Sequence, residues 1–585
     1  MAHEQQNSIC MKASDYIAEF LKTQEITTSF VMAGGMITHI LDSLYYSGSP
    51  RIVAVHHEQA AAFAADAYGR ITGKPGIGLA TSGPGATNLL TGIASCYFDS
   101  SPAVFITGQV NTNELKGIRP IRQLGFQETD IVAMAAPITK ACFQVERANQ
   151  IEEIMYRAFE IAMSGRPGPV LIDIPMNLQR ADITVAPIQK VHRHTQVAAN
   201  FRTSSLKALQ ESITNAKRPL VLAGRGIRSA FAVDRLRSFI EHTQLPVVTS
   251  LLAVDVMPYH HPLRVGFIGS YGNRWANLAL GTADVIIVIG SRLDIRQTGA
   301  DVEGFRKGKK IFHIDCDEGE INNRVVECVS IVVDAGEFLD HATREFASAQ
   351  FAKRKEWLEE IQGLRERWPD IQEIHGIPGI NPNSFMHALS QQSMGASGYC
   401  VDVGNHQMWA AQSLELQPNQ FFMTSGGMGS MGFALPAAIG ASFADDMKPV
   451  VVIAGDGGFQ LNIQELQTVV RTKLPLKMVV INNNTLGMIR QFQDSYFEGR
   501  HQSTSWGYSA PDFAEVAKAF GIEALTISTT EEIEKALRWM WRTPDSPSLL
   551  QVMIDMQANA YPKIAFGKPI TEMEPFAKPL DMEGT

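Results

Sequence analysis

Short apolar runs alternate with longer segments of helical periodicity along almost the whole chain. Residues 219–223, 284–292 and 310–315 illustrate the runs, which are rich in β-branched residues and end in glycine or polar side chains. Apolar runs without polar alternation are typical of strands buried on both faces of a parallel sheet. Strand and helix signals in alternation predict an α/β protein made of doubly wound parallel sheets.

Two stretches interrupt this alternation and predict the domain organisation. Residues 181–200 are rich in polar residues, and residues 351–384 contain a charged helix-like run, 353–368, followed by the sequence His-Gly-Ile-Pro-Gly. Proline and glycine at such positions are typical of linkers. We therefore expect three α/β domains and a short tail, with the bounds 1–188, 200–348, 381–570 and 571–585.

Composition narrows the class of protein. The 585 residues are 45% hydrophobic and 19% charged, with a net charge of -9 and no long basic run, which argues against a nucleic-acid partner. The polar start MAHEQQNSIC does not resemble a signal peptide, and no apolar run approaches the roughly 18 residues of a membrane span. The six cysteines lack CxxC spacing, which favours reduced thiols over a zinc site. We expect a cytoplasmic protein with no membrane partner.

The stretch 449–497 carries the strongest chemical signal. The apolar run 450–453 ends at Gly455-Asp456-Gly457-Gly458, and a second apolar run, 478–481, ends at Asn482-Asn483-Asn484. Ligands of open α/β sheets bind at the carboxyl ends of strands. The carboxylate of Asp456 and the amide oxygen of Asn483 suit an octahedral Mg²⁺ shared with phosphates, and the glycines allow the backbone to approach a diphosphate.

Three further features are weak when each is taken alone. Glu58 stands between an apolar run, 51–55, and an Ala-rich helix, 59–70. A carboxylate at the start of a helix interacts favourably with the helix dipole, and this alone explains its presence. A strand followed by Gly224-Arg225-Gly226 could hold a dinucleotide phosphate but lacks the third glycine of the fingerprint. Asp315, at another strand end, could bind a ribose or be an ordinary solvated terminus.

The motifs taken together resemble one family. Gly455-Asp456-Gly457 followed by Asn482-Asn483 looks like the thiamine diphosphate (ThDP) motif. The resemblance to the acetohydroxyacid (acetolactate) synthase catalytic subunit then covers nearly the whole chain, through GGMITHI, VHHEQAAAFAADAYGR, TSGPGATNLLTGIASCYFDSSP, GFQETD, PITK, SGRPGPVLIDIP, GNHQMWAAQ, TSGGMGSMGFALPAAIGA and GDGGFQLNIQELQT.

This resemblance implies a pyrimidine-binding, a central Rossmann-like FAD and a diphosphate-binding domain, in a homodimer or homotetramer with active sites between subunits. It implies Mg²⁺ held by Asp456, Asn483 and the Thr485 carbonyl. Glu58 would bond the aminopyrimidine of ThDP and promote deprotonation of the cofactor. Other implied ThDP positions are Pro84, Asn88, Gly404, Asn405 (more often Gln in the family), His406, Gly429, Met431 under the cofactor, Gly455, Gly457, Gly458 and Met488. Gly35, Phe126, Gln127 and Lys140 match positions that line the substrate channel.

The resemblance also implies FAD in the central domain, without net redox turnover. The stretch GSRLDIRQTG is usually absent from FAD-free relatives. The matching positions are Arg166, Gly224, Arg225, Gly226, Thr249, Ser250, Leu251, Gly269, Gly290, Arg292, Asp294, Arg296, Asp315, Asp334 and Ala335.

Substrate-side positions depart from the family pattern. Phe492 replaces a Trp that shapes the pocket for a 2-ketobutyrate acceptor, Tyr271 lies in an altered MLGMHG-like stretch, and Lys563 adds a charge near the expected active-site cap. Drift in a biosynthetic synthase explains these changes, and so does a bulkier or anionic acceptor. We favour pyruvate as donor with a nucleotide-linked 4-keto-deoxysugar as acceptor, as in the branched-chain-sugar (yersiniose-type) offshoot. The ordinary alternative is an acetohydroxyacid synthase of branched-chain amino-acid synthesis.

Two other classes of protein remain open from the sequence. One is an FAD-dependent oxidase resembling pyruvate oxidase. The other is a binding protein that has kept the fold without the activity, against which the intact Glu58, Asp456 and Asn483 argue.

Overall fold

The computed structural model describes residues 8–193 and 203–580, which form two compact units. The first unit contains residues 8–193, 425–450 and 461–476, and the second contains residues 203–424, 451–460 and 477–580. Three six-stranded sheets make up the core, and their strand pairings are parallel. The α/β architecture of three doubly wound parallel sheets, predicted from the alternation of apolar runs, is confirmed.

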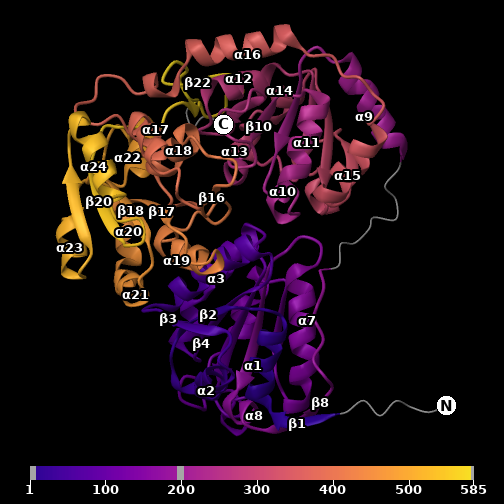
Figure 1. The fold of residues 1–585 in the computed structure, drawn as a ribbon, viewed down its shortest axis with the longest axis vertical. Helices are drawn as coiled ribbons and strands as arrows, with labels where there is room; N and C mark the ends of the chain where they lie inside the picture. Colours follow the sequence, from indigo (N-terminus) through magenta and orange to yellow (C-terminus); the bar gives the residue numbers. More distant parts are fainter. Residues whose placement is uncertain (1–7, 194–202, 581–585) are drawn as a thin grey trace. The chain divides into compact units, whose positions relative to one another are not determined.

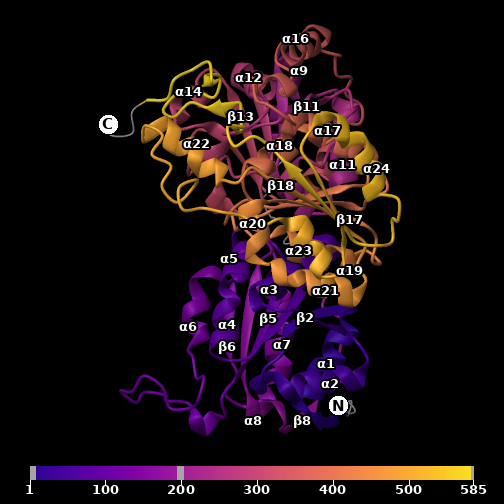
Figure 2. The ribbon, with the colours of Figure 1, turned by 90° about the vertical axis from the view of Figure 1, so that its left-hand side faces the viewer.

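The sheet of the first unit has alternating faces that receive different helices. Ile77 and Leu79 point into a core shared with α1 (Ala13–Thr23) and α7 (Ile151–Met163), whereas Gly76 on the other face touches α3 (Glu58–Thr72). Figure 2 shows α1, α4, α6 and α7 around the strands of this unit. Across the sheet the strands follow the order β3 (Arg51–Ala54), β2 (Thr28–Met32), β4 (Gly76–Ala80), β5 (Ala103–Gln109), β7 (Pro169–Pro175), β6 (Ala141–Gln144).

The remaining α-helices and strands of this unit are helices of four to eleven residues and a small antiparallel ribbon. They are α2 (Thr38–Ser47), α4 (Pro84–Asn88), α5 (Leu90–Phe98), α6 (Ile131–Ala135), α8 (Met176–Gln179), α19 (Ala434–Ala444), α21 (Leu466–Thr472) and the antiparallel pair β1 (Ile9–Lys12) and β8 (Asp182–Val185). Small residues let α3 pack very closely: a Cβ on Gly92 would lie 2.2 Å from the Cβ of Ala62, and one on Gly440 would lie 2.0 Å from the Ala64 carbonyl oxygen.

The central sheet lies in the second unit between two apolar cores, one on each face. Its strands follow the order β11 (Arg264–Phe267), β10 (Val247–Thr249), β9 (Pro219–Ala223), β12 (Val285–Ile289), β13 (Lys310–Asp315), β14 (Val329–Val332). Numbered along the chain this order is 3-2-1-4-5-6, the arrangement of dinucleotide-binding folds. Its helices are α9 (Thr203–Asn215), α10 (Gly226–Ser229), α11 (Val233–Thr243), α12 (Arg274–Thr282), α13 (Ile295–Thr298), α14 (Val302–Arg306), α15 (Ala335–Glu345) and α16 (Lys355–Arg367).

The third sheet belongs to the same unit and appears in orange and yellow in Figure 1. Its strands follow the order β16 (Phe421–Met423), β15 (Gly398–Val401), β17 (Val450–Gly455), β18 (Leu476–Asn482), β20 (Ser548–Met553), β19 (Glu523–Ile527). The associated helices are α17 (Pro382–Gln392), α18 (Asn405–Ser413), α20 (Asp456–Leu461), α22 (Gly487–Tyr496), α23 (Phe513–Ala519) and α24 (Ile533–Met540). The hairpin of β21 (Lys563–Ile564) and β22 (Met573–Glu574) ties part of the predicted tail to the fold.

Sequence and structure agree closely on the strands. The apolar runs 219–223 and 310–315 coincide with β9 and β13 residue for residue, and the helix-like run 353–368 contains α16. Each six-stranded sheet lies inside one of the predicted domains, while part of the first predicted linker and the last residues of the predicted tail lie outside the described residues. Across residues 8–193 and 203–580, none of the helices is long and apolar enough to span a membrane.

Candidate active site

Three oxygen-bearing groups converge at the carboxyl edge of the third sheet. Asp456 follows β17 and is buried, and Asn483 and Thr485 follow β18, the neighbouring strand. One end of the Asn483 amide lies 2.8 Å from the Thr485 carbonyl oxygen and 3.3 Å from Asp456 Oδ1. A nitrogen at that end would donate to both oxygens, whereas an oxygen there would bring three oxygens together.

The spacing of these atoms fits a small divalent cation. Mg²⁺ binds its oxygen ligands at 2.0–2.1 Å in an octahedron, so adjacent ligand oxygens are about 2.9 Å apart. The two distances around the Asn483 amide straddle that value. Burial raises the pKa of Asp456 to about 6, although a hydrogen bond from the Tyr508 hydroxyl at 3.0 Å acts in the opposite direction. A cation here would relieve this cost, because it favours the ionised carboxylate.

The turn after β15 supplies a cradle beside these oxygens. Gly404 has a φ of +157°, and a Cβ on Gly455 would lie 2.9 Å from His406 Nδ1, so neither position accepts a side chain easily. Burial lowers the pKa of His406 to about 3, so its imidazole is neutral, and its Nε2 has no hydrogen-bond partner among the described residues. A buried polar atom without a partner is costly unless a ligand satisfies it. The cradle therefore fits the diphosphate that the sequence predicts.

The other glycines of this site are explained by close packing. A Cβ on Gly458 would lie 2.4 Å from Asp402 Oδ1, and one on Gly487 would lie 2.8 Å from the side-chain nitrogens of both Asn405 and Asn483. Asn405 donates from Nδ2 to the Ala558 carbonyl oxygen at 3.1 Å. The residues predicted for ThDP on this sheet thus lie at the end of β17, at the start of α18, in α20 and in α22, with Gly457 in α20 and Met488 in α22.

A second cluster surrounds Glu58 in the first unit. Glu58 begins α3, is 9% exposed, and accepts a hydrogen bond at Oε2 from Asn88 Nδ2 at 3.0 Å. A Cβ on Gly85 would lie 3.2 Å from Glu58 Oε1, so the turn after β4 approaches the carboxylate closely. The carboxylate is therefore fixed in a nearly dry environment at a helix N-terminus, where the helix dipole stabilises its negative charge.

The predicted channel residues divide into two groups. Gln127 has a φ of +66°, and its Cβ lies 3.0 Å from the position that a Cβ on Gly83, the residue before Pro84, would occupy. The ring of the neighbouring Phe126 is 79% exposed. Gly35 starts a short 3₁₀ helix after β2 and has open space around it. Lys140 lies elsewhere: its Nζ donates to the carbonyl oxygens of Ile161, at 2.5 Å, and Ser164, at 2.6 Å, at the carboxyl end of α7.

The Gly- and Met-rich loop is bound to α5 and α3 through charged side chains. Asp99 accepts from the backbone nitrogens of Gly426 at 3.0 Å and Gly427 at 2.6 Å, and it pairs with the buried Arg70 of α3. This network holds the loop that carries Gly429 and Met431 within the first unit.

The central sheet brings the predicted FAD positions to its carboxyl edge. Gly224 and Gly226 follow β9 and Gly290 follows β12, the two strands between which the strand order reverses, where dinucleotides bind. A Cβ on Gly224 would lie 2.2 Å from the Gly290 carbonyl oxygen, so both turns require glycine for packing alone. The other positions lie at or after strand ends or begin helices: Arg225, Thr249, Ser250, Leu251, Gly269, Arg292, Asp294, Arg296, Asp315, Asp334 and Ala335.

Several of these positions also have a structural role. Asp294 and Asp334 accept backbone N–H groups at the starts of α13 and α15, and Asp315 accepts the N–H of Asp317. Arg166 belongs to the first unit, where its Nε donates to Ser100 Oγ at 2.8 Å.

An aromatic cluster surrounds the predicted substrate positions. The ring of Phe492 is 37% exposed and lies 4.7 Å from that of Tyr496 on the same helix, α22. Lys563 Nζ lies 5.4 Å above the Tyr496 ring and 3.1 Å from Glu574 Oε1, and the side chains of Lys563 and Glu574 are only 12% and 8% exposed. The positive charge of Lys563 is therefore neutralised by Glu574 inside the protein. At Tyr271, another of the predicted substrate positions, burial raises the pKa of the hydroxyl to about 12.

Sequence reasoning missed three residues of this region. Tyr508 binds Asp456, Glu574 pairs with Lys563, and Gln412 donates to the carbonyl oxygens of Tyr271 and Tyr561. The partners of Tyr508 and Gln412 are remote in sequence, and Glu574 meets Lys563 across a hairpin of two-residue strands, so no local spacing signals these contacts. Gln412 did stand within the motif GNHQMWAAQ, which was the available signal.

Comparisons with known proteins agree with this geometry. Three family models match in order: thiamine pyrophosphate enzyme N-terminal TPP binding domain at residues 11–134, central domain at 206–342 and C-terminal TPP binding domain at 402–552. The acetolactate synthase large subunit of Corynebacterium glutamicum is 36% identical over 96% of this chain and 90% of its own length. The acetolactate synthase isozyme 2 large subunit of Escherichia coli is 36% identical over 96% of this chain and 99% of its own length. The acetolactate synthase large subunit of Lactococcus lactis is 34% identical over 96% of this chain and 95% of its own length.

Proposed function

Because the chain belongs to the thiamine pyrophosphate enzymes, in the group of the acetolactate synthase large subunits, we propose that it decarboxylates pyruvate and joins the resulting two-carbon unit to a second 2-keto acid. The observation that carries the proposal is the convergence of Asp456, Asn483 and the Thr485 carbonyl at a strand edge. The corresponding biological role is branched-chain amino-acid synthesis.

In this proposal the chain's residues hold the cofactor and manage its protons. Asp456, Asn483 and Thr485 hold Mg²⁺, while the turns of Gly404 and Gly455 accommodate the diphosphate. Bound thiamine diphosphate supplies a carbon nucleophile and an electron sink for decarboxylation. Glu58, oriented by Asn88, would hold or release a proton beside the aminopyrimidine ring of the cofactor. Met431, which the resemblance places under the cofactor, would help to exclude water, which would otherwise quench the ligation.

We place the complete site between two chains, so a homodimer is the smallest active assembly and a homotetramer is the alternative. The second chain then supplies what one chain lacks around Phe126 and Gln127. The exposure of four large apolar side chains in one segment, Ile118, Ile121, Leu124 and Phe126, supports this placement, because a group of exposed apolar side chains is typical of an interaction site.

We propose FAD as a third cofactor, bound along the carboxyl edge of the central sheet. The strand order 3-2-1-4-5-6 and the paired glycine turns at its reversal support this choice. The flavin absorbance of the purified protein tests it. Bleaching by pyruvate with reoxidation by O₂ at the turnover rate would replace the ligase proposal with a pyruvate oxidase.

The acceptor proposed here differs from the one that the sequence favoured. Lys563 suggested an anionic sugar acceptor, but the structure pairs Lys563 with Glu574. The relatives named above are acetolactate synthases. Phe492 stands where the family pattern has the larger Trp, and its ring is 37% exposed. This residue is the remaining argument for a larger acceptor.

A product analysis separates these functions. The protein is incubated with pyruvate, Mg²⁺ and thiamine diphosphate, alone, with 2-ketobutyrate, and with a nucleotide-linked 4-keto-deoxysugar. We expect acetolactate from the first mixture and acetohydroxybutyrate from the second. A branched sugar product without acetolactate would overturn the 2-keto acid acceptor.

A further inference from the structure

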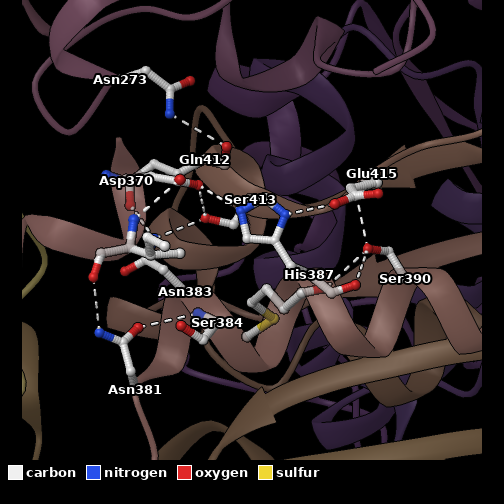
Figure 3. A network of polar contacts seen from close by, with 12 residues as sticks. Asn273, Asp370, Asn381, Asn383, Ser384, His387, Ser390, Gln412, Ser413 and Glu415 are labelled. Carbon is white, nitrogen blue, oxygen red and sulfur yellow. Dashed lines mark hydrogen bonds and ion pairs between the residues drawn. The ribbon is translucent and has the colours of Figure 1, made fainter. Parts of the chain in front are cut away.

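The side-chain amide of Gln412, at the end of α18, joins two segments that are far apart in the sequence. Gln412 is 1% exposed, and its Nε2 donates to the carbonyl oxygens of Tyr271 at 2.8 Å and Tyr561 at 3.1 Å. Its Oε1 accepts from Asn383 Nδ2 at 3.0 Å (Figure 3). The amide therefore has one orientation, because a flipped amide would turn its oxygen toward two carbonyl oxygens.

A chain of hydrogen bonds continues from this amide to a histidine (Figure 3). Asn383 Nδ2 also donates to Ser413 Oγ at 2.8 Å, so the hydroxyl proton of Ser413 is directed to Asp370 Oδ2. The same carboxylate oxygen lies 2.9 Å from His387 Nε2, and His387 Nδ1 lies 2.9 Å from Glu415 Oε1. Four side chains, those of His387, Asp370, Ser413 and Asn383, thus connect Glu415 to Gln412 without a break.

The geometry indicates that His387 is an imidazolium. Both ring nitrogens face carboxylates, and ionised carboxylates only accept hydrogen bonds, so each nitrogen must carry a proton. Burial by itself would lower the pKa of His387, but Asp370 and Glu415 outweigh burial and raise it. Burial by itself would raise the pKa of Asp370, but His387 and Ser413 outweigh it and lower that pKa.

Polar, aromatic and cationic side chains from neighbouring elements surround His387 and Asp370. His260 lies 3.3 Å from Glu415 Oε2, Gln391 donates to Glu415 Oε1, and the ring of Tyr259 meets that of His387 edge-on at 5.9 Å. The guanidinium groups of Arg264 and Arg365 lie over the Tyr259 ring at 4.8 and 5.1 Å. Of these two cations, Arg264 interacts favourably with Asp370 and supports its ionised form, so the carboxylate stays an acceptor over the physiological range.

The two carbonyl groups held by Gln412 belong to segments with predicted substrate residues. Tyr271 is itself one of them, and Tyr561 precedes Lys563 by two positions. Asn273 Nδ2 also donates to the Gln412 carbonyl oxygen at 3.2 Å, which ties the first segment to α18 a second time. A change in the Gln412 amide would therefore move both segments relative to α22, where Phe492 lies.

We propose that Gln412 is a positioning residue that sets the spacing of the substrate-pocket walls, and that the chain through Ser413 and Asp370 to His387 keeps its amide in the required orientation. The role assigned to the pocket rests on the proposed function. The amide does not touch the substrate. It acts through the backbone of Tyr271 and Tyr561, and its effect is on which acceptor enters the pocket.

Competition between two acceptors tests this role. With pyruvate and 2-ketobutyrate present together, the ratio of acetohydroxybutyrate to acetolactate is independent of the folded fraction of the enzyme. We expect Gln412→Met, which keeps the size but removes the amide, to change this ratio by at least about threefold, since a methylene-sized change in a pocket is worth roughly tenfold or more. A ratio equal to that of the wild type would overturn the proposal.

The pH dependence of the same ratio tests the His387 chain. Above pH 6.5 the imidazolium is lost as the pH rises through its raised pKa, so the wild-type ratio should shift toward that of Gln412→Met. His387→Gln should give a ratio that no longer depends on pH in this range. His260→Gln is the matched control, because His260 is 72% exposed and reaches only the far oxygen of Glu415. Equal pH profiles for His387→Gln and the wild type would overturn the coupling.

Hydrogen exchange of the whole protein provides a readout without catalysis. Peptides that contain Tyr271 and Tyr561 should exchange faster in Gln412→Met, while peptides of β18 keep their wild-type rates. Unchanged exchange in both segments would overturn the positioning role even if the protein ligates no 2-keto acid. Absence of acetolactate from the wild type, in contrast, would refute the proposed function and leave this exchange comparison in force.

Discussion

Replacing Glu58 by Gln separates two roles for the same carboxylate. A carboxylate in the first turn of a helix stabilises that helix by about 0.3–1 kcal/mol, and this role requires no chemistry. A carboxylate that exchanges protons with a cofactor contributes a rate factor of roughly 10² to 10⁴. Glu58 occupies the first residue of α3, so both roles are compatible with its position.

The structure allows the magnitude of each effect to be worked out for Glu58→Gln. Asn88 Nδ2 donates to Glu58 Oε2, and a glutamine carbonyl can accept the same bond, so the local fold is retained. The lost helix-dipole interaction is at most about 1 kcal/mol, which lowers the melting temperature by no more than about 4 °C. The lost proton transfer lowers the rate of pyruvate consumption at saturating cofactor by roughly 100-fold or more.

The assay pairs initial rates with thermal melting, and Glu515→Gln is the control. Glu515 lies in the first turn of α23 with its side chain 68% exposed, so its replacement removes a helix-dipole contact away from the site. We expect its rate to be unchanged. The reasoning about Glu58 is refuted if Glu58→Gln keeps a rate within about threefold of the wild type, because a proton-exchange role requires a larger loss.

Three further predictions concern charged groups. In the metal-free protein the pKa of Asp456 is raised to about 6, and only the carboxylate binds metal, so Mg²⁺ affinity measured by titration calorimetry should fall as the pH drops below 6. Glu574→Gln leaves the charge of Lys563 without its partner, so anionic acceptors should bind more tightly, seen as a lower KM at low ionic strength. Arg274→Met breaks a bidentate pair with Glu373, whose two side chains are 5% and 3% exposed, and should lower the unfolding free energy by about 3–5 kcal/mol in denaturant titrations.

Each of these predictions has a contrasting outcome. A flat Mg²⁺ affinity between pH 7 and pH 5 would exclude Asp456 as a ligand. An unchanged KM in Glu574→Gln would mean that Lys563 does not face the acceptor. Arg235→Met is the control for Arg274, because the pair of Arg235 and Asp340 is 40% and 50% exposed and should contribute only about 0–1 kcal/mol.

The sequence predicted those parts of the molecule that depend on local pattern. Strands such as β9 are apolar throughout because both faces are covered, and each ends where a glycine or a polar side chain follows. Asp456 and Asn483 were identified because each directly follows such a strand, and neighbouring parallel strands end at the same edge. Parallel topology alone thus brings these two residues together.

Contacts made by side chains across distant segments could not be predicted in this way. The partner of Lys563 depends on the β21–β22 hairpin, whose two strands are two residues each. Lys140 matches a family motif, yet its ammonium group binds the end of α7, a contact that depends on how the helix packs. Gln412 reaches Tyr271 only because α18 lies against the central domain.

The first and third sheets have the same strand order when their strands are numbered along the chain, 2-1-3-4-6-5. Each of these two domains is therefore a copy of the same topology, with loops at matching strand ends. In the first copy the acidic group follows the second strand, as Glu58 after β3, while Thr81 and Ser82 follow the third strand. In the second copy the third strand leads to Asp456, while the second leads to Thr424 and Ser425. Exchanging these loops between the copies would show whether either scaffold can still support the other's task.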